Sequence, residues 1–275
     1  MMRSLLITAI GAVALSTIAA AFTAAPAQAR PGARPLTVMS FNIHHGAGTD
    51  EVLSLPRIAD VIKANGADVI GLQEVDRHYS ERSEWADQPA ELAELLGYHV
   101  VFGANIDEEP PAEGRPRIQY GTAILSRYPI TAWQNTHLFQ SPDQEQRGLL
   151  EASIDVNGKE FRFYDTHLAA SSESDRQEQA RQIIDLIEHD RPGVLVGDMN
   201  AEPTAPEIKT LAADLDDTWL TAGEGDPSTF PAEAPTKRID MIFGTGRVQP
   251  VRSAVVDTDP VASDHRPVTA KIIIR

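Results

Sequence analysis

Short apolar runs recur along the chain, and most of them are followed at once by polar residues. Apolar runs of about four to eight residues, continuous or alternating with polar positions, are typical of β-strands. Strands are therefore predicted at 36–43, 69–72, 98–102, 121–125, 149–156, 161–166, 194–196, 239–243 and 267–274.

Three segments instead space their apolar residues as one face of a helix does. They cover 54–65, with Ser54 as N-cap, 89–97 and 172–190. Asn157-Gly158 has the composition of a tight hairpin turn between two of the strands. Because strands are joined both by hairpins and across helices, the pattern predicts an α/β fold with mixed sheets.

Two stretches lack this periodicity. Residues 105–117 are polar and rich in proline, and we expect them to form a mobile loop near the cleft. Residues 1–29 have a cationic start, an apolar core and a small-residue exit, which predicts a secretory signal peptide cleaved after Ala29. A membrane anchor is the alternative, but Gly11 and Ser16 interrupt the run. A short linker (30–35) and one domain (36–275) would follow.

Composition narrows the class of partner. Removing residues 1–29 would remove the positive charge of Arg3 and change the formal net charge from −16 to −17. Overall acidity opposes the many phosphate contacts with which a protein grips duplex DNA. The chain contains no cysteine, so an exported form would be stabilised by packing and metal rather than by disulfides.

The polar residues after the apolar runs carry the candidate chemistry. Carboxylate, amide and imidazole groups recur there, in Ser40-Phe41-Asn42, Gln73-Glu74, Thr166-His167, Gly197-Asp198-Met199-Asn200, Arg238-Ile239-Asp240 and Ser263-Asp264-His265. Gathered at strand ends, such groups can bind a hard divalent cation and activate water.

Individual residues support this interpretation. Glu74, after a buried strand, with Asn42 beside it suits Mg²⁺, although a solvated glutamate would fit the same segment. His265, with Asp264 and Asp240, suits activation of water, although Asp-His-Arg-Pro also fits a turn. In Asp198-x-Asn200, an extended backbone would project both side chains to one side, where the amide could donate to a phosphoryl oxygen; a turn or helix cap is the alternative.

The order of these motifs resembles the endonuclease/exonuclease/phosphatase superfamily, the DNase I-like hydrolases, across residues 36–274. The resemblance implies a four-layer α-β-β-α sandwich of two mixed sheets and metal-dependent phosphoester hydrolysis with Mg²⁺, or with Mn²⁺ or Ca²⁺ as alternatives. It places Asp240 behind His265 and Asp264 close to the metal. It also implies phosphate contacts from His167 and Tyr120.

Two further residues are weaker candidates for phosphate contact. Arg147 could neutralise a phosphate oxygen, but an exposed structural arginine fits its position nearly as well. His44 departs from the pattern of the abasic-site endonucleases, which place an acidic residue two positions after the asparagine. Loop histidines more often have no specific role.

The favoured hypothesis is a secreted Mg²⁺-dependent phosphodiesterase or phosphatase that acts on a lipid or small phosphoester, such as a phospholipid head group. The alternative is an extracellular nuclease, which the acidic composition disfavours. A non-enzymatic binding protein is disfavoured because the catalytic set looks complete. Nothing in the sequence indicates an obligate protein partner.

Overall fold

The structure is a computed structural model in which residues 34–274 are described. The predicted signal peptide and residues 30–33 of the predicted linker lie outside these residues, so export stays a prediction. Residues 34 and 35 of the linker already belong to the first strand. Among residues 34–274, no helix combines the length and the apolar composition needed to span a membrane.

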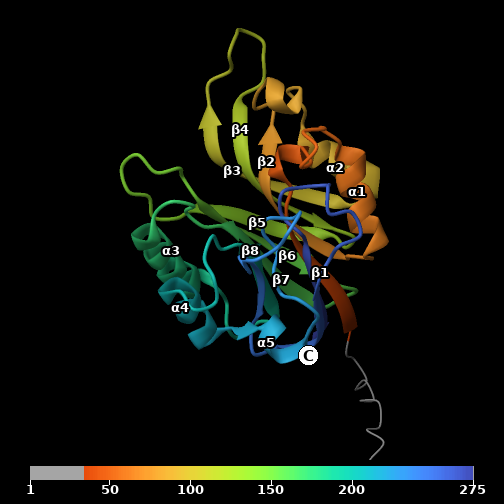
Figure 1. The fold of residues 1–275 in the computed structure, drawn as a ribbon, viewed down its shortest axis with the longest axis vertical. Coiled ribbons are helices and arrows are strands. Elements are labelled where there is room, and N and C mark those ends of the chain that lie inside the picture. The colour runs from red at the N-terminus through yellow and green to blue at the C-terminus, as the bar shows by residue number, and fades with distance from the viewer. Residues whose placement is uncertain (1–33, 275) are drawn as a thin grey trace, which may run out of the picture. The chain divides into compact units, whose positions relative to one another are not determined.

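Two mixed sheets form the centre of the fold (Figure 1). The seven-stranded sheet has the order β10 (Gly223–Glu224), β12 (Val248–Val255), β13 (Val268–Ile274), β1 (Arg34–Asn42), β2 (Val69–Arg77), β4 (Ile118–Ser126) and β3 (His99–Glu108). The six-stranded sheet has the order β5 (Ile130–His137), β6 (Gly148–Asp155), β7 (Glu160–His167), β8 (Gly193–Asp198), β11 (Asp240–Gly244) and β9 (Asp216–Asp217).

Helices cover the outer faces of the sheets. The helices are α1 (Leu55–Ala64), α2 (Gln88–Leu96), α3 (Glu173–Leu186), α4 (Pro206–Asp214) and α5 (Thr218–Ala222), with the 3₁₀ turns η1 (His44–Gly46) and η2 (Glu81–Ser83). Helices α1 and α2 pack on the seven-stranded sheet, and α3 and α4 pack on the six-stranded sheet. This is the predicted four-layer α-β-β-α sandwich.

Each interface between layers has its own apolar core. Between the sheets, Leu36 and Val38 pack with Phe161 and Phe163. A second cluster joins β1 and β2 to α1 and α2, and a third joins β7, β8 and β11 to α3 and α4. Burial on both faces explains the continuous apolar runs at 69–72 in β2 and 194–196 in β8.

Several element boundaries differ from the predicted ones. The strand predicted at 69–72 continues to Arg77, and the one predicted at 98–102 continues to Glu108, which takes residues 105–108 out of the predicted loop. The helix predicted at 172–190 ends at Leu186, because Ile187 is extended and leads toward β8. The prediction omits β5, β12 and α4, whose sequences lack a strong apolar pattern. Most residues of β5 are exposed or half-buried at the edge of its sheet.

Candidate active site

Strand register brings three of the predicted site residues together in the six-stranded sheet. Asp198, the last residue of β8, lies opposite His167 on the parallel strand β7. On the other side it lies opposite Asp240, the first residue of the antiparallel strand β11. All three side chains are buried. Ligand sites of α/β sheets commonly form at the carboxyl ends of parallel strands, as here.

A β-bulge delivers Glu74 to the same place from the other sheet. The register between β2 and β4 shifts between Leu72 and Val75, and Glu74 has a left-handed φ of 58°. Such bulges re-aim side chains beside active sites. The sequence predicted Glu74 at the end of its strand, but Glu74 lies within β2, at the bulge.

Asn42, at the end of β1, connects the two sheets through its side chain. The Nδ2 group of this fully buried residue donates to Glu74 Oε1 (3.0 Å) and to Asp198 Oδ2 (3.1 Å). Its Oδ1 accepts from the backbone N–H of His44 (3.1 Å). Asn42 thus holds two carboxylates a short distance apart. Its predicted role as a metal ligand stays a prediction.

His265 and Asp240 form the closest imidazole–carboxylate pair in the described residues. His265 Nδ1 lies 2.9 Å from Asp240 Oδ2, so Nδ1–H donates to the carboxylate. The ring of Phe230 packs on the imidazole with a centroid distance of 4.7 Å. The hydrogen bond at Nδ1 leaves His265 Nε2 facing Asp198, whose Oδ2 lies 3.6 Å away.

Asp198 lies at the centre of the cluster. Its Oδ2 is also 3.5 Å from Nε2 of His167. Burial and the nearby Asp240 carboxylate raise the pKa of Asp198 to about 7, although His265 acts in the opposite direction. Burial alone would lower the pKa of His265, but the carboxylates of Asp240, Asp198 and Asp264 outweigh it and raise this pKa to about 10.

Asn200 is close to the cluster but not in the predicted geometry. The backbone is not extended there, because β8 ends at Asp198 and Asn200 adopts a left-handed φ of 48°. The N–H of Asn200 donates to Asp198 Oδ1 (2.9 Å), and its Nδ2 donates to the carbonyl of Leu168 (3.0 Å). The segment is therefore a turn that fixes the Asp198 carboxylate, which was the alternative interpretation.

Arg147 is buried rather than exposed. Its Nη1 contacts His167 Nδ1 (3.0 Å) and Glu145 Oε1 (2.7 Å), and its Nε has no hydrogen-bond partner among residues 34–274. Because arginine only donates, Nδ1 of His167 accepts and Nε2 carries the proton. Burial, followed by the charges of Arg147 and His265, lowers the pKa of His167 well below its usual value, so the ring is neutral.

Tyr120 and Asp264 lie beside the cluster. Burial, together with the carboxylates of Glu74 and Glu145, raises the pKa of Tyr120 far above its usual value, so its hydroxyl stays protonated. Asp264 is half-buried, and its charge acts on both His45 and His265. Among residues 34–274, no hydrogen bond or ion pair joins the Asp264 carboxylate to Asp198, Asp240 or Glu74, and its predicted place close to a metal stays a prediction.

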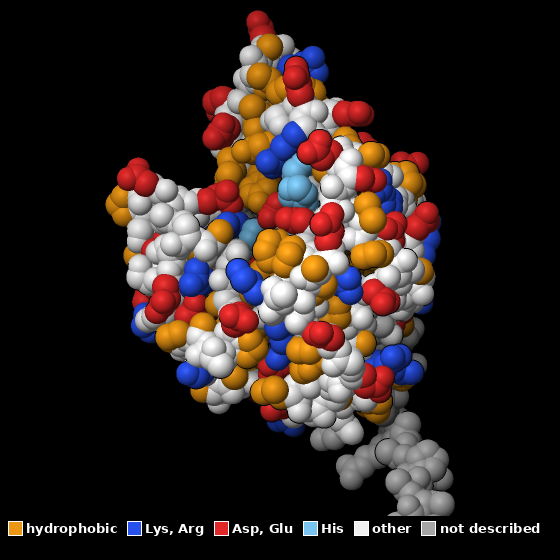
Figure 2. Space-filling model, in the orientation of Figure 1, with side chains coloured by type: hydrophobic (Ala, Val, Ile, Leu, Met, Phe, Trp, Pro, Cys, Tyr) orange, Lys and Arg blue, Asp and Glu red, His pale blue; other side chains and the backbone are white. Residues whose placement is uncertain are grey.

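Arg82 lies near the site but is not among the predicted site residues. This residue of η2 forms a two-point contact with the fully buried Asp76 (2.7 and 2.8 Å), and its guanidinium lies 4.5 Å from the ring of Tyr79 and 5.5 Å from that of Tyr120. No local sequence signal identifies this arrangement. Histidine, acidic and basic side chains lie close together on one face of the molecule (Figure 2).

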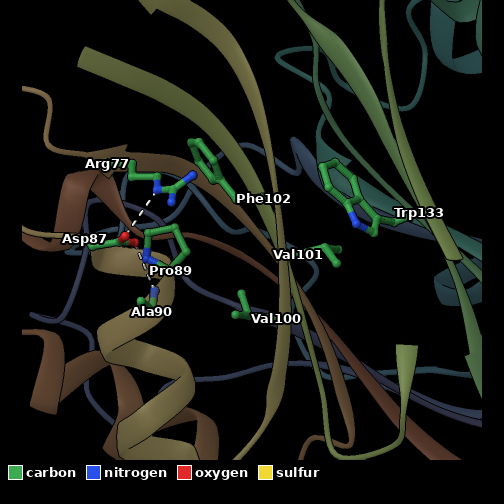
Figure 3. A pocket seen from close by; sticks show the side chains of 8 residues that line it. All are labelled: Arg77, Asp87, Pro89, Ala90, Val100, Val101, Phe102 and Trp133. Atoms are coloured by element: carbon green, nitrogen blue, oxygen red, sulfur yellow. Dashed lines mark hydrogen bonds and ion pairs between the residues drawn. The ribbon is translucent and has the colours of Figure 1, made fainter. Parts of the chain in front are cut away.

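Two cavities differ in their relation to the cluster. One of about 430 Å³ borders His265 and Asn200 and is lined further by Phe230, Lys237 and Arg176, among others. Another of about 240 Å³ lies at the sheet edges between α2, β3 and β5, where Phe102 and Trp133 face it (Figure 3). The second contains none of the predicted site residues. The first is therefore the better candidate for substrate.

The described residues fit a divalent cation. Two buried carboxylates, Asp198 and Asp240, share one imidazole, and Asp240 Oδ1 is buried without a hydrogen-bond partner among residues 34–274. Glu74 adds a third carboxylate through Asn42. This excess of negative charge is costly in a buried site unless a cation compensates for it.

Comparisons with known proteins agree on the family. The sequence pattern of the endonuclease/exonuclease/phosphatase family matches residues 39–265. YbhP of Escherichia coli (strain K12) is 27% identical over 249 residues, which are 86% of this chain and 95% of YbhP.

Solved structures extend the comparison. The crystal structure of an endonuclease/exonuclease/phosphatase from Beutenbergia cavernae DSM 12333 has a TM-score of 0.78 at 30% identity, covering 88% of this chain and 72% of that chain. A mannosyl-6-phosphatase from Bacteroides thetaiotaomicron VPI-5482 has a TM-score of 0.69 at 21% identity, covering 86% of this chain and 99% of that chain. The latter likeness shows the fold alone.

Proposed function

The chain belongs to the endonuclease/exonuclease/phosphatase family, and we propose that it hydrolyses a phosphoester with water activated by His265 in the presence of a divalent cation. The observation that carries this proposal is the hydrogen bond of 2.9 Å between His265 Nδ1 and Asp240 Oδ2. It fixes the tautomer and directs Nε2 toward Asp198. An imidazole oriented in this way by a carboxylate can accept a proton from water.

His265 must lose its proton before it can act as a base. Its carboxylate neighbours raise its pKa to about 10, so in the protein alone it is protonated at neutral pH. A divalent cation bound beside Glu74 would supply positive charge that lowers the pKa of neighbouring groups and polarises a phosphoryl oxygen. Asp240 holds the imidazole of His265 in place whether the ring is protonated or neutral.

Three other residues are suited to stabilise the phosphoryl oxygens. Neutral His167 has its proton on Nε2, facing the centre of the cluster. The Tyr120 hydroxyl remains protonated and can donate a hydrogen bond. Arg147 supplies a buried positive charge behind His167. Donors aimed at developing negative charge typically contribute several kcal/mol to catalysis, on the order of 3 for one donor.

The substrate we propose is a lipid or small-molecule phosphoester rather than a long nucleic acid. Among the basic side chains in and around the motif-bearing segments, five are already ion-paired with acidic residues: Arg77, Arg82, Arg117, Arg147 and Arg238. Among residues 34–274, Arg115, Lys237 and Arg266 have no ion-pair partner, and Arg266 donates to the carbonyl of Ala232. Binding of a polyanion grows with the number of phosphates neutralised, so these few unpaired cations suit a compact head group better.

The size and charge of the cavity beside His265 support the same class of substrate. Its volume of about 430 Å³ is in the usual range for small-molecule sites. Lys237 lies in its lining, whereas Arg176 is paired with Glu207 (2.6 Å). A mannosyl-6-phosphatase with the same fold supports a small phosphorylated substrate.

Export from the cell remains part of the proposal and would be tested by N-terminal sequencing of protein from culture medium.

A panel of phosphoesters would test the proposal. Sugar phosphates, phosphatidylinositol, sphingomyelin and supercoiled plasmid would each be incubated with purified protein and Mg²⁺ or Mn²⁺ at physiological salt. We expect turnover of at least one small or lipid phosphoester, abolished by EDTA. Faster cleavage of plasmid than of every other substrate would support the nuclease alternative. Full activity in excess EDTA would remove the role of the metal.

A further inference from the structure

A second cluster of possible metal ligands lies beside the catalytic one. His44, His45 and Glu74 each offer a ligand atom, and these atoms lie within 4.8 Å of one another. The three residues come from two segments, the 3₁₀ turn η1 after β1 and the bulge in β2. All three side chains are half-buried, so a small ion can reach them from solvent.

The backbone directs these side chains together at a conformational cost. His44, His45 and Glu74 have φ values of 44°, 45° and 58°, in the left-handed region that residues other than glycine rarely adopt. Gly46 continues the left-handed run with φ 80°, and a Cβ there would lie 3.0 Å from a Leu55 methyl group. Non-glycine residues persist in such conformations when the surrounding structure determines them, and they cluster at functional sites.

Neighbouring groups fix the conformation and the tautomer. His44 Nδ1 lies 3.3 Å from the carbonyl of Ala47, which can only accept, so Nδ1 carries the proton and the Nε2 lone pair is free. Metal-binding histidines commonly donate their second ring nitrogen to a carbonyl in this way. The fully buried Gln88 donates to the carbonyl of His45 (2.6 Å) and accepts from the N–H of Asp76 (2.9 Å).

Asn42 couples this cluster to the catalytic one. It accepts from the N–H of His44 and donates to Glu74 Oε1, so it holds the turn and the bulge against each other. The nearby positive charge of Arg82 is already compensated by the buried Asp76. Among residues 34–274, neither ring nitrogen of His45 has a hydrogen-bond partner. Two imidazoles and a carboxylate are therefore available at one place.

We propose that His44, His45 and Glu74 form a binding site for a divalent transition-metal ion such as Zn²⁺ or Co²⁺, in preference to Mg²⁺. Imidazole nitrogen suits these ions, whereas Mg²⁺ favours an octahedral shell of oxygens. The inference rests on the proposed function only because Glu74 belongs both to this site and to the proposed catalytic site. It assigns the two histidines of the turn as specificity-determining ligands for the metal.

The experiment measures ligands rather than turnover. Co²⁺ is titrated into metal-free protein and followed by visible absorption, and Zn²⁺ and Mg²⁺ affinities are measured by calorimetry. The test variant is the double substitution His44→Asn/His45→Asn, because asparagine tolerates left-handed backbone and removes the imidazoles. Two control variants each remove a histidine elsewhere: His265→Ala from the catalytic cluster, and His189→Ala from an exposed ring bonded to a carbonyl.

We expect a saturable Co²⁺ spectrum in the wild type and in both controls, and its loss in the double variant. Affinity for Zn²⁺ should fall at least ~10-fold in the double variant, with a smaller change for Mg²⁺. X-ray absorption of the Zn²⁺-loaded wild type should show imidazole scattering, a result that does not depend on whether a variant folds.

Unchanged Zn²⁺ affinity in the folded double variant would overturn the proposal, as would loss of the Co²⁺ spectrum in His265→Ala instead, or absence of imidazole scattering. These measurements report the ligands whether or not any phosphoester is hydrolysed. Failure of the proposed function would therefore leave the result intact, and turnover by the wild type would not rescue a failed metal site.

Discussion

Replacing Asn42 by aspartate should destabilise the metal-free protein and make its stability depend on a divalent cation. The substitution changes one NH₂ group into an oxygen and keeps the size of the side chain. The amide lies 3.0 Å from Glu74 Oε1 and 3.1 Å from Asp198 Oδ2, so the introduced carboxyl faces two others at hydrogen-bonding distance.

The magnitude follows from the two hydrogen bonds that are lost. A hydrogen bond to a charged group contributes about 1.5–3 kcal/mol, and Glu74 is only half-buried, so we expect a loss of about 3–5 kcal/mol in the free energy of unfolding at pH 8 in EDTA. The pKa of Asp198 is raised to about 7, and the Asn42 amide normally lowers it, so the variant raises it further.

The pH dependence has a definite sign. A carboxyl whose pKa is higher in the folded than in the unfolded protein stabilises the fold while it is protonated, and this stabilisation is lost as pH rises through the folded pKa. Below pH 7 a protonated Asp198 can donate to the introduced carboxyl, so the difference from wild type should shrink as pH falls from 8 to 5. A saturating divalent cation should also stabilise the variant more than the wild type, because the new carboxylate is an additional oxygen ligand.

Urea denaturation at pH 5 and pH 8, with EDTA or with Mg²⁺, would measure these differences. Asn157→Asp is the matched control, because this residue lies in an exposed hairpin turn where Asp-Gly is equally suitable. A surface substitution usually changes the free energy of unfolding by no more than about 0.5 kcal/mol. A change of that size or smaller in the Asn42 variant at pH 8 in EDTA would refute the reasoning that Asn42 holds two carboxylates together.

Two other substitutions test separate parts of the account. Glu74→Gln should raise the metal concentration needed for half-maximal activity by about 10-fold or more, because a neutral amide is a poorer ligand, and a metal titration of turnover would show it. Asp165→Asn should remove a pH dependence of stability. Burial raises the pKa of Asp165 well above 3.8, although the hydrogen bond from Gln73 (2.6 Å) acts in the opposite direction. The free energy of unfolding of the wild type should therefore fall as pH rises above about 4, by up to ~1.4 kcal/mol per pH unit. Urea denaturation from pH 5 to 8 should show the wild type losing stability relative to the variant, and parallel curves would contradict the assignment.

Much of the fold could be predicted from the sequence because its central strands are buried on both faces. Apolar patterns identified β1, β7 and β8, alternating in β1 and continuous in β8, and the polar residue after each pattern lies at the site: Asn42, His167 and Asp198. Strand β5 has mostly exposed and half-buried residues, so it has no comparable apolar run.

The geometry of the site was less predictable, because it depends on local backbone features and on contacts between distant segments. Neither the bulge at Glu74 nor the left-handed turn at Asn200 follows from residue type, and the extended geometry predicted for Asn200 was wrong. The contact of Arg82 with Asp76 and two tyrosine rings requires the folded arrangement of η2 and β4.

The most direct test of the central claim is the turnover of the best phosphoester substrate by His265→Ala, measured beside the wild type under the same metal concentration. The account predicts a loss of about 10²–10⁴ in kcat, with unchanged metal affinity and a circular dichroism spectrum like that of the wild type, because His265 acts on water rather than on the cation. A folded variant that retains more than half of the wild-type kcat (a change far below the ~10²-fold expected for a lost base) would contradict the assignment of His265 and the hydrolytic mechanism built on it.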